Sequence, residues 1–133
     1  MNEAFADTSY HLALLNADDE LHGLADEFPV YEYERLITSA WVVTEILDAL
    51  RHPRLRVTAY KYVRDLQRNP RVLVVPPDSE LLEAGIELFG KRRDKGWSLT
   101  DCISFVIMEQ YGLTDALTTD HHFEQAGFNV LLK

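Results

Sequence analysis

Four carboxylates stand where an apolar segment of the sequence begins or ends, or along its margin: Asp7, Glu45, Asp101 and Asp120. Asp101 precedes the apolar run CISFVIM, and Asp120 follows the shorter run ALTT. An unpaired carboxylate is costly to bury. Such positions are therefore typical of a helix cap, of a surface just outside the core, or of a site where a metal ion compensates several carboxylates together.

The third possibility would bring a definite chemistry to the chain. Hard divalent cations choose oxygen ligands, and Mg²⁺ is typically held by a few carboxylates, several waters and substrate phosphates. Clustered carboxyl groups raise one another's pKa by repulsion, and a bound ion relieves that cost. Because bound Mg²⁺ or Mn²⁺ can activate water and stabilise charge on a phosphodiester, converging carboxylates would indicate metal-dependent phosphodiester hydrolysis.

Short apolar runs alternate with helical patterns along the whole chain. Strands are predicted over residues 4–7, 36–38, 72–75, 116–119 and 128–132. Helices are predicted over 9–16, 18–27, 40–51, 55–69, 79–91 and 99–111, with a short helix between the last two strands. This alternation predicts a single α/β domain over residues 1–133. Its central sheet of four to five strands is expected to be mostly parallel and covered by helices on both faces.

This architecture predicts where the acids lie. In parallel α/β sheets, ligands bind outside the carboxyl ends of the strands. Asp7 closes the first strand, Asp120 follows the fourth and Asp101 begins a buried helix, so all three are expected at one edge of the sheet. On the helix over 40–51, Glu45 lies at the margin of the apolar stripe, whereas Asp48 lies nearly opposite and is expected to be solvated.

Each acid also has a purely structural explanation. The segment Ser98-Leu99-Thr100-Asp101 fits the capping box, in which a hydroxyl and an acid satisfy the first N–H groups of a helix. Asp7 and Asp120 each follow a predicted strand and precede a helix, so each could be an N-cap. Capping therefore stays open for these acids taken singly, and the four together favour a shared site.

Composition narrows the class of protein. A chain of 133 residues that is 47% hydrophobic and 26% charged is typical of one globular domain. No apolar run approaches the roughly 18 residues of a membrane span, and the start MNEAFADTSY lacks a signal-peptide pattern. Cys102 is the only cysteine, which excludes an internal disulfide and suits a reducing compartment. We therefore expect a cytoplasmic protein with no membrane association.

Charge is distributed unevenly along the sequence. The net charge of −9 argues at first sight against a nucleic-acid partner. Eleven of the thirteen Lys and Arg residues nevertheless lie between Arg51 and Lys95, which could mean a basic surface beside an acidic pocket or simply solvated helix faces. Arg92 and Arg93 are candidate substrate-binding residues, although the dipole of the preceding helix explains basic residues there equally well.

Several stretches of the chain resemble one known family. DTSYHLALLNADDELH (7–22), TEILDAL (44–50), WSLTDCISF (97–105) and ALTTDHHFEQAGFNVLL (116–132) are similar, in order and spacing, to PIN-domain ribonucleases. The resemblance is greatest to the VapC-like toxins of type II toxin–antitoxin pairs and spans essentially the whole chain. It implies a PIN-like three-layer α/β/α fold.

The resemblance also implies roles for individual residues. Ser9 and Thr119 match small hydroxyl positions that would support the catalytic acids. The metal-binding and catalytic residues would be the acidic quartet Asp7, Glu45, Asp101 and Asp120, holding Mg²⁺ or Mn²⁺. The implied activity is endonucleolytic hydrolysis of RNA, such as tRNA or rRNA, by a homodimer that a cognate antitoxin silences.

Two alternative interpretations concern the same region. A non-catalytic RNA- or protein-binding module on a PIN-like fold would use the acids only as caps. His121 and His122 invite a zinc site, but no Cys or suitably spaced His completes one in the sequence. Cys102 is expected to be a core residue without a base to activate it, and Trp97 is expected to pack in the interior unless it is exposed.

Overall fold

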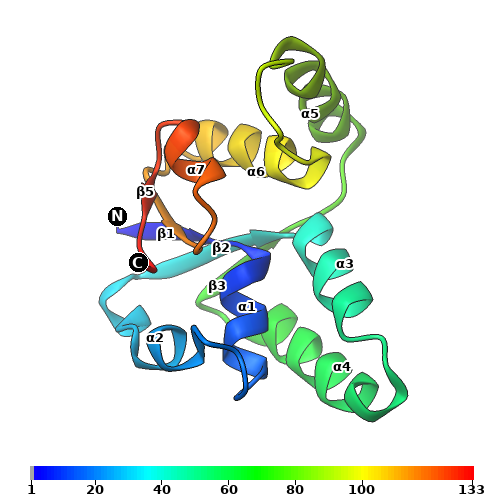
Figure 1. Cartoon of the computed structure of the whole chain (residues 1–133), viewed down its shortest axis with the longest axis vertical. Coiled ribbons are helices and arrows are strands. Elements are labelled where there is room, and N and C mark those ends of the chain that lie inside the picture. Colours follow the sequence, from blue (N-terminus) through cyan, green and yellow to red (C-terminus); the bar gives the residue numbers. More distant parts are fainter. Residues whose placement is uncertain (1) are drawn as a thin grey trace.

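A computed structural model describes residues 2–133 and contains one five-stranded sheet (Figure 1). The strand order is β3-β2-β1-β4-β5, and every neighbouring pair is parallel. The strands are β1 (Glu3–Ala6), β2 (Arg35–Ser39), β3 (Val72–Val75), β4 (Asp115–Leu117) and β5 (Asn129–Val130). The predicted central parallel sheet is therefore confirmed, with β1 in the middle.

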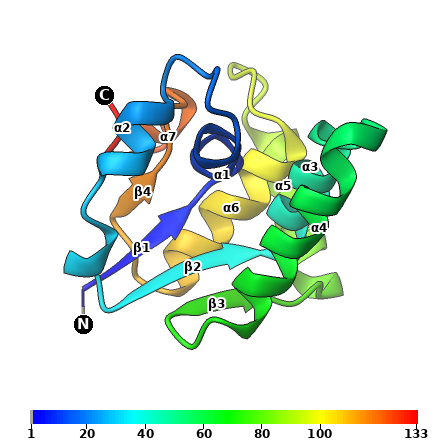
Figure 2. The ribbon, with the colours of Figure 1, turned by 90° about the horizontal axis from the view of Figure 1, so that it is seen from below.

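Helices cover both faces of this sheet (Figure 2). The helices are α1 (Thr8–Leu15), α2 (His22–Glu27), α3 (Ala40–Ala49), α4 (Pro53–Arg68), α5 (Ser79–Lys91), α6 (Leu99–Gln110) and α7 (His122–Gln125), with a 3₁₀ turn over Val30–Glu32. Two apolar clusters form, one between the sheet and helices α1 and α2, the other between the sheet and α6. The predicted three-layer α/β/α arrangement is confirmed.

The two faces follow from the alternation of side chains along β1 and β2. Phe5 and Ile37 are fully buried and pack with residues of α6 such as Ile103. The intervening residues Ala6 and Thr38 point to the opposite face, towards α1. Because successive side chains of a strand point to opposite sides, one short strand contributes to both layers. This leaves β1 buried on both faces and fixes the residue that follows it, Asp7.

Most predicted boundaries differ from the structure by one or a few residues, and three of these differences affect the helices and the candidate site. The helix expected from residue 18 begins at His22, because Asn16 and Asp19 side chains accept backbone N–H groups two residues ahead and hold the chain in turns. The helix expected from residue 55 begins at Pro53, since proline is well tolerated in a first turn. Strand β4 ends at Leu117, and the residues after it turn into the candidate site.

A buried polar contact joins α1 to α4. His11 is almost fully buried, and its Nδ1 lies 2.7 Å from the Tyr62 hydroxyl. Burial lowers the pKa of His11 to about 4, so the ring is neutral at pH 7. The α4 helix, which carries many of the basic residues, is thereby attached to the helix that follows Asp7.

Close packing of α5 on α6 leads to a test in which two glycines of one helix respond oppositely. A Cβ at Gly85 would overlap Ile103 Cγ1, whereas one at Gly90 would meet nothing within 4 Å. Gly85→Ala should destabilise the protein by about 1–2 kcal/mol, because overpacking outweighs the gain in helix propensity. Gly90→Ala should stabilise it by up to about 1 kcal/mol. Urea unfolding of both variants measures the difference, and equal effects would contradict the packing.

Among residues 2–133, none of the helices combines the length and the apolar character that a bilayer span requires.

Candidate active site

The acidic quartet comes from four different elements whose ends meet at the carboxyl edge of the sheet. Asp7 follows β1 and precedes α1, Glu45 lies in α3, Asp101 lies in the first turn of α6, and Asp120 lies between β4 and α7. The charges of Asp101 and Glu45 raise the pKa of Asp7, and the charge of Asp120 raises that of Asp101. These interactions link the four carboxylates in a series, in which Glu45 and Asp101 both act on Asp7, and Asp120 acts on Asp101.

Asp7 is the most deeply buried member of the quartet, with 5% of its surface exposed. Thr118 Oγ1 donates to its Oδ2 at 2.9 Å, and Ser9 Oγ lies 3.5 Å from the same oxygen. Desolvation raises the pKa of Asp7 to about 7, although the hydroxyl of Thr118 opposes this effect. Asp7 precedes α1 but makes no side-chain cap hydrogen bond there, so capping does not explain its burial.

Asp101 forms the predicted capping box and still has an oxygen to spare. The backbone N–H of Ser98 donates to Asp101 Oδ2 at 3.1 Å, and the N–H of Asp101 donates to Ser98 Oγ at 3.0 Å. Burial is the largest cause of the raised pKa of this carboxyl group. Capping and a role in the site therefore coexist, because only Oδ2 takes part in the box.

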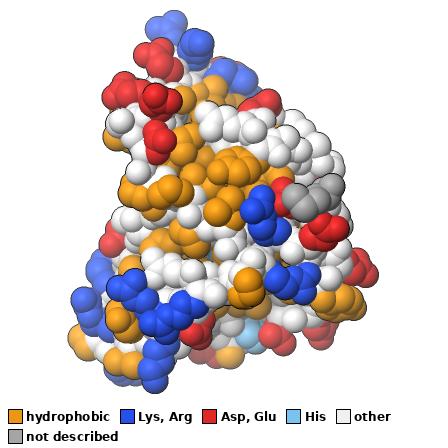
Figure 3. All heavy atoms as spheres, turned by 180° about the vertical axis from the view of Figure 1, so that it is seen from behind, with side chains coloured by type: hydrophobic (Ala, Val, Ile, Leu, Met, Phe, Trp, Pro, Cys, Tyr) orange, Lys and Arg blue, Asp and Glu red, His pale blue; other side chains and the backbone are white. Residues whose placement is uncertain are grey.

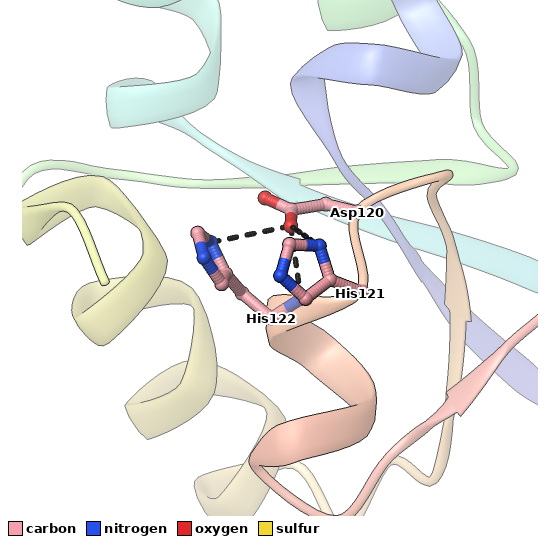
Figure 4. Close-up of side chains that lie close together, drawn as sticks. All are labelled: Asp120, His121 and His122. Carbon is pink, nitrogen blue, oxygen red and sulfur yellow. Dashed lines mark hydrogen bonds and ion pairs between the residues drawn. The ribbon is translucent and has the colours of Figure 1, made fainter. Parts of the chain in front are cut away.

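His122 connects two members of the quartet. Its Nδ1 lies 3.3 Å from Asp101 Oδ2 and 3.2 Å from Asp120 Oδ1 (Figure 4 shows the second contact). The backbone N–H of His122 also donates to Asp120 Oδ1 at 2.9 Å. The sequence analysis considered this histidine only as a zinc ligand and missed its contact with both carboxylates.

Glu45 lies at the margin of α3, half-buried, whereas Asp48 on the same helix is exposed, as the helical periodicity predicted. Thr8 Oγ1 donates to Glu45 Oε1 at 2.6 Å. Thr8 is the second residue that the sequence analysis missed. It comes directly after Asp7, so the hydrogen bond from Thr8 to Glu45 joins α1 to α3 beside the first two acids of the quartet.

One pattern is common to all four acids. In each carboxylate one oxygen is held by donors of the protein, namely Asp7 Oδ2, Glu45 Oε1, Asp101 Oδ2 and Asp120 Oδ1. Within residues 2–133, the opposite oxygens receive no side-chain hydrogen bond, and no Lys or Arg pairs with any of the four acids. Oriented carboxylates with one oxygen to spare fit a divalent cation, since ligating carboxylates are normally held by outer hydrogen bonds.

The four carboxylates do not form a compact cluster of ligand atoms. In the described part of the chain, the one set of three or more metal-ligating side chains whose ligand atoms lie within 4.8 Å of one another is Asp120, His121 and His122. No three of the four carboxylates form such a set, so an ion held by them would have to complete its coordination with water, as Mg²⁺ typically does.

The hydroxyl side chains that contact Asp7 are those of Ser9 and Thr118. Thr119, which the resemblance implied, contributes its backbone N–H to Ser9 Oγ at 3.1 Å, while its side chain makes no hydrogen bond among residues 2–133. Thr118 is fully buried, contacts Asp7 and Ser9, and accepts the N–H of Asp120 at 3.0 Å. The structure therefore corrects this position by one residue, because β4 ends before Thr118.

The two arginines considered for substrate binding have different surroundings. Arg92 donates twice to Asp94, both at 3.1 Å, and its guanidinium lies 4.9 Å from the centroid of the Trp97 ring. Arg93 is exposed and, together with Lys95 and Gly96, lines a hollow of about 560 Å³ beside the start of α6. Figure 3 shows basic side chains gathered at two ends of one face of the molecule.

Two further residues have the structural roles expected from the sequence. Trp97 is buried, packs edge-on against Phe105 with centroids 4.9 Å apart, and donates to Gln125. Cys102 is fully buried, and burial raises the pKa of its thiol, which leaves it unreactive. Neither contributes a polar atom to the quartet.

Comparison with known proteins finds relatives that match nearly the whole chain. The chain is 29% identical over 124 residues to the "23S rRNA-specific endonuclease VapC20" of two Mycobacterium tuberculosis strains, covering 93% of this chain and 94% of the relative. The crystal structure of M. tuberculosis VapC20, described as a sarcin–ricin loop cleaving toxin, superposes with a TM-score of 0.86 at 27% identity over 94% of this chain and 95% of that one.

A more distant structure shares the fold alone. FitAcB from Neisseria gonorrhoeae superposes with a TM-score of 0.62 at 18% identity over 96% of this chain and 95% of that one. Residues 4–129 match the PIN domain family. The chain therefore belongs to the PIN domain family, as its sequence resemblance predicted.

Proposed function

We propose that this protein is a Mg²⁺-dependent endoribonuclease, with Mn²⁺ able to substitute, and that it is the toxin of a toxin–antitoxin pair. The observation that carries the proposal is the orientation of the quartet, in which each carboxylate keeps one oxygen without a side-chain donor. PIN nucleases generally use divalent metal ions, and carboxylate oxygens are the ligands that Mg²⁺ and Mn²⁺ prefer.

The residues of the site would have three roles, namely metal binding, orientation of the attacking water and positioning of the carboxylates. Asp7, Asp101 and Asp120 would hold the ion, and Glu45, which is half-buried at the rim, would hold the ion or orient the attacking water. A bound divalent ion supplies an acidified water and stabilises the charge of the phosphodiester. Thr8, Ser9, Thr118 and His122 would keep the carboxylates in place.

The substrate is proposed to be ribosomal RNA. VapC20 is named as a 23S rRNA endonuclease and as a toxin that cleaves the sarcin–ricin loop, and it covers nearly the whole chain. The exposed Arg93, beside the start of α6, is proposed to contact an RNA phosphate, whereas Arg92 is occupied with Asp94 and Trp97. A cognate antitoxin, a homodimer and a cytoplasmic location remain part of the proposal.

Cleavage assays with wild type and with two variants of α3 test the proposal. Purified, antitoxin-free wild type should cleave a 23S rRNA fragment in Mg²⁺ or Mn²⁺ and not in EDTA. Glu45→Gln should lower the rate by at least about 10–100-fold, which is the loss typical of an outer partner of a metal site and a lower bound for a direct ligand. Asp48→Asn, on the same helix but exposed, should leave the rate unchanged. Cleavage in EDTA, or equal rates for the two variants, would contradict the assignment, and no cleavage at all would favour a binding module.

A further inference from the structure

The side chains of Asp120, His121 and His122 form a compact cluster of mixed oxygen and nitrogen donors at the start of α7 (Figure 4). One ligand atom from each residue lies within 4.8 Å of the others. Asp120 Oδ1 lies 3.2 Å from His122 Nδ1 and 3.8 Å from His121 Nδ1. Both imidazole rings therefore direct a nitrogen to the same carboxylate oxygen.

These separations are close to those of a tetrahedral zinc site. With Zn–N and Zn–O bonds near 2.0–2.2 Å, neighbouring ligand atoms lie about 3.3–3.5 Å apart. The His122 contact already has this length, and the His121 contact needs to shorten by a few tenths of an ångström. His121 can move, because 73% of its side chain is exposed. The fourth position would be open to water, as in zinc sites with three protein ligands.

The donor set differs from that of the quartet. Imidazole nitrogen favours zinc and related transition metals, whereas carboxylates and water favour Mg²⁺ and Mn²⁺. Two histidines and one carboxylate would therefore select Zn²⁺ over the ion that the quartet is suited to hold. The sequence alone did not predict such a site because the two histidines are adjacent and lack the usual ligand spacing.

We propose that Asp120, His121 and His122 form a Zn²⁺ site whose occupation inhibits RNA cleavage. Zinc would replace the contacts of His122 Nδ1 with Asp101 and Asp120, so these carboxylates would lose a group that helps to orient them. Zinc would also draw Asp120 towards the histidines. The inhibitory part of this proposal rests on the proposed nuclease function, and the binding part does not.

Binding is tested by calorimetry with Zn²⁺ alone as the probe, in a background of excess Mg²⁺. Wild type should bind one Zn²⁺ per chain, and His121→Ala should weaken that binding by at least about 100-fold, because losing a ligand costs more than losing an outer partner. His52→Asn is the control, since His52 is an exposed imidazole that caps α4, and asparagine preserves a capping side chain. Equal zinc affinity of His121→Ala and wild type would overturn the site.

Inhibition is tested with the same proteins in Mg²⁺. Without zinc, wild type and His121→Ala should cleave RNA at the same rate. Added Zn²⁺ should abolish cleavage by wild type and by His52→Asn at concentrations that leave His121→Ala active. A wild type that binds zinc and cleaves undiminished would overturn the inhibitory role. If no protein cleaves RNA under any condition, the nuclease function fails, and calorimetry still decides whether the zinc site exists.

Discussion

Asp7→Asn should make the metal-free protein more stable at pH 8, by about 2 kcal/mol, while it lowers RNA cleavage by about 10²–10³-fold or more. The reason is the burial of this carboxyl group without a cation, which raises its pKa from 3.8 to about 7. Since one pKa unit corresponds to about 1.4 kcal/mol, keeping Asp7 ionised at pH 8 costs on the order of 4 kcal/mol. Asp7→Asn should regain only part of this free energy, because the buried amide of asparagine also needs hydrogen-bond partners.

The pH dependence of this gain has a definite sign. A raised pKa means that the folded wild type holds a proton that the unfolded chain has released between pH 3.8 and about 7. Asp7 therefore does not lower the free energy of unfolding below pH 3.8, and it lowers this free energy progressively as the pH rises to about 7. The advantage of Asp7→Asn should vanish near pH 4 and reach a plateau above pH 7. His11, whose lowered pKa destabilises both proteins in acid, cancels in the comparison.

In Mg²⁺, wild type should be more stable than Asp7→Asn, which is the reverse of the order expected in EDTA. Mg²⁺ that binds the folded wild type raises its free energy of unfolding, and it should do little for a variant that has lost a ligand. Urea unfolding in EDTA and in Mg²⁺, at pH 4, 6 and 8, measures both effects. A variant no more stable than wild type at pH 8 in EDTA would show that the burial of Asp7 carries no such cost.

Thr118→Val should weaken metal binding and cleavage by about 10–100-fold, whereas Thr119→Val should have little effect on either. Both substitutions remove a hydroxyl and keep a β-branched shape. Only the hydroxyl of Thr118 donates to Asp7 Oδ2 and accepts the N–H of Asp120. Without it, Asp7 loses the contact that opposes its raised pKa, and a buried backbone N–H is left without its acceptor.

Calorimetry with Mn²⁺ and cleavage of the same RNA fragment measure the pair. Circular dichroism and urea unfolding check that both variants remain folded. If Thr119→Val has the larger loss, the hydroxyl beside the quartet has been assigned to the wrong threonine.

The sequence predicted the sheet and most helices because their signals are local. The β-branched run Val72–Val75 before two prolines is a strand as predicted, and the periodicity of α3 separated Glu45 from Asp48 correctly. Boundaries failed where short polar side chains compete with the helix, as Asn16 and Asp19 do before α2.

The residues that hold the four carboxylates in place could not be predicted from the sequence, because their roles depend on contacts between distant parts of the chain. In the doublet Thr118-Thr119, the end of β4 decides which hydroxyl faces Asp7, and a shift of one residue reverses the answer. The contact of Thr8 with Glu45 joins residues 37 positions apart, and no local pattern marks it. His122 reaches Asp101 because α7 begins with His122, two residues after Asp120.

The central place of β1 has a consequence for the synthesis of the chain. Its neighbour β4 comes from the other end of the sequence, so the hydrogen bond between Asp7 and Thr118 spans 111 residues. Contacts of such separation form late, and domains fold from nascent chains as their segments emerge. A nascent chain that lacks Asp120 has no complete quartet, however well its first helices fold. With the quartet as the proposed active site, the nuclease would stay inactive while the ribosome is still making it.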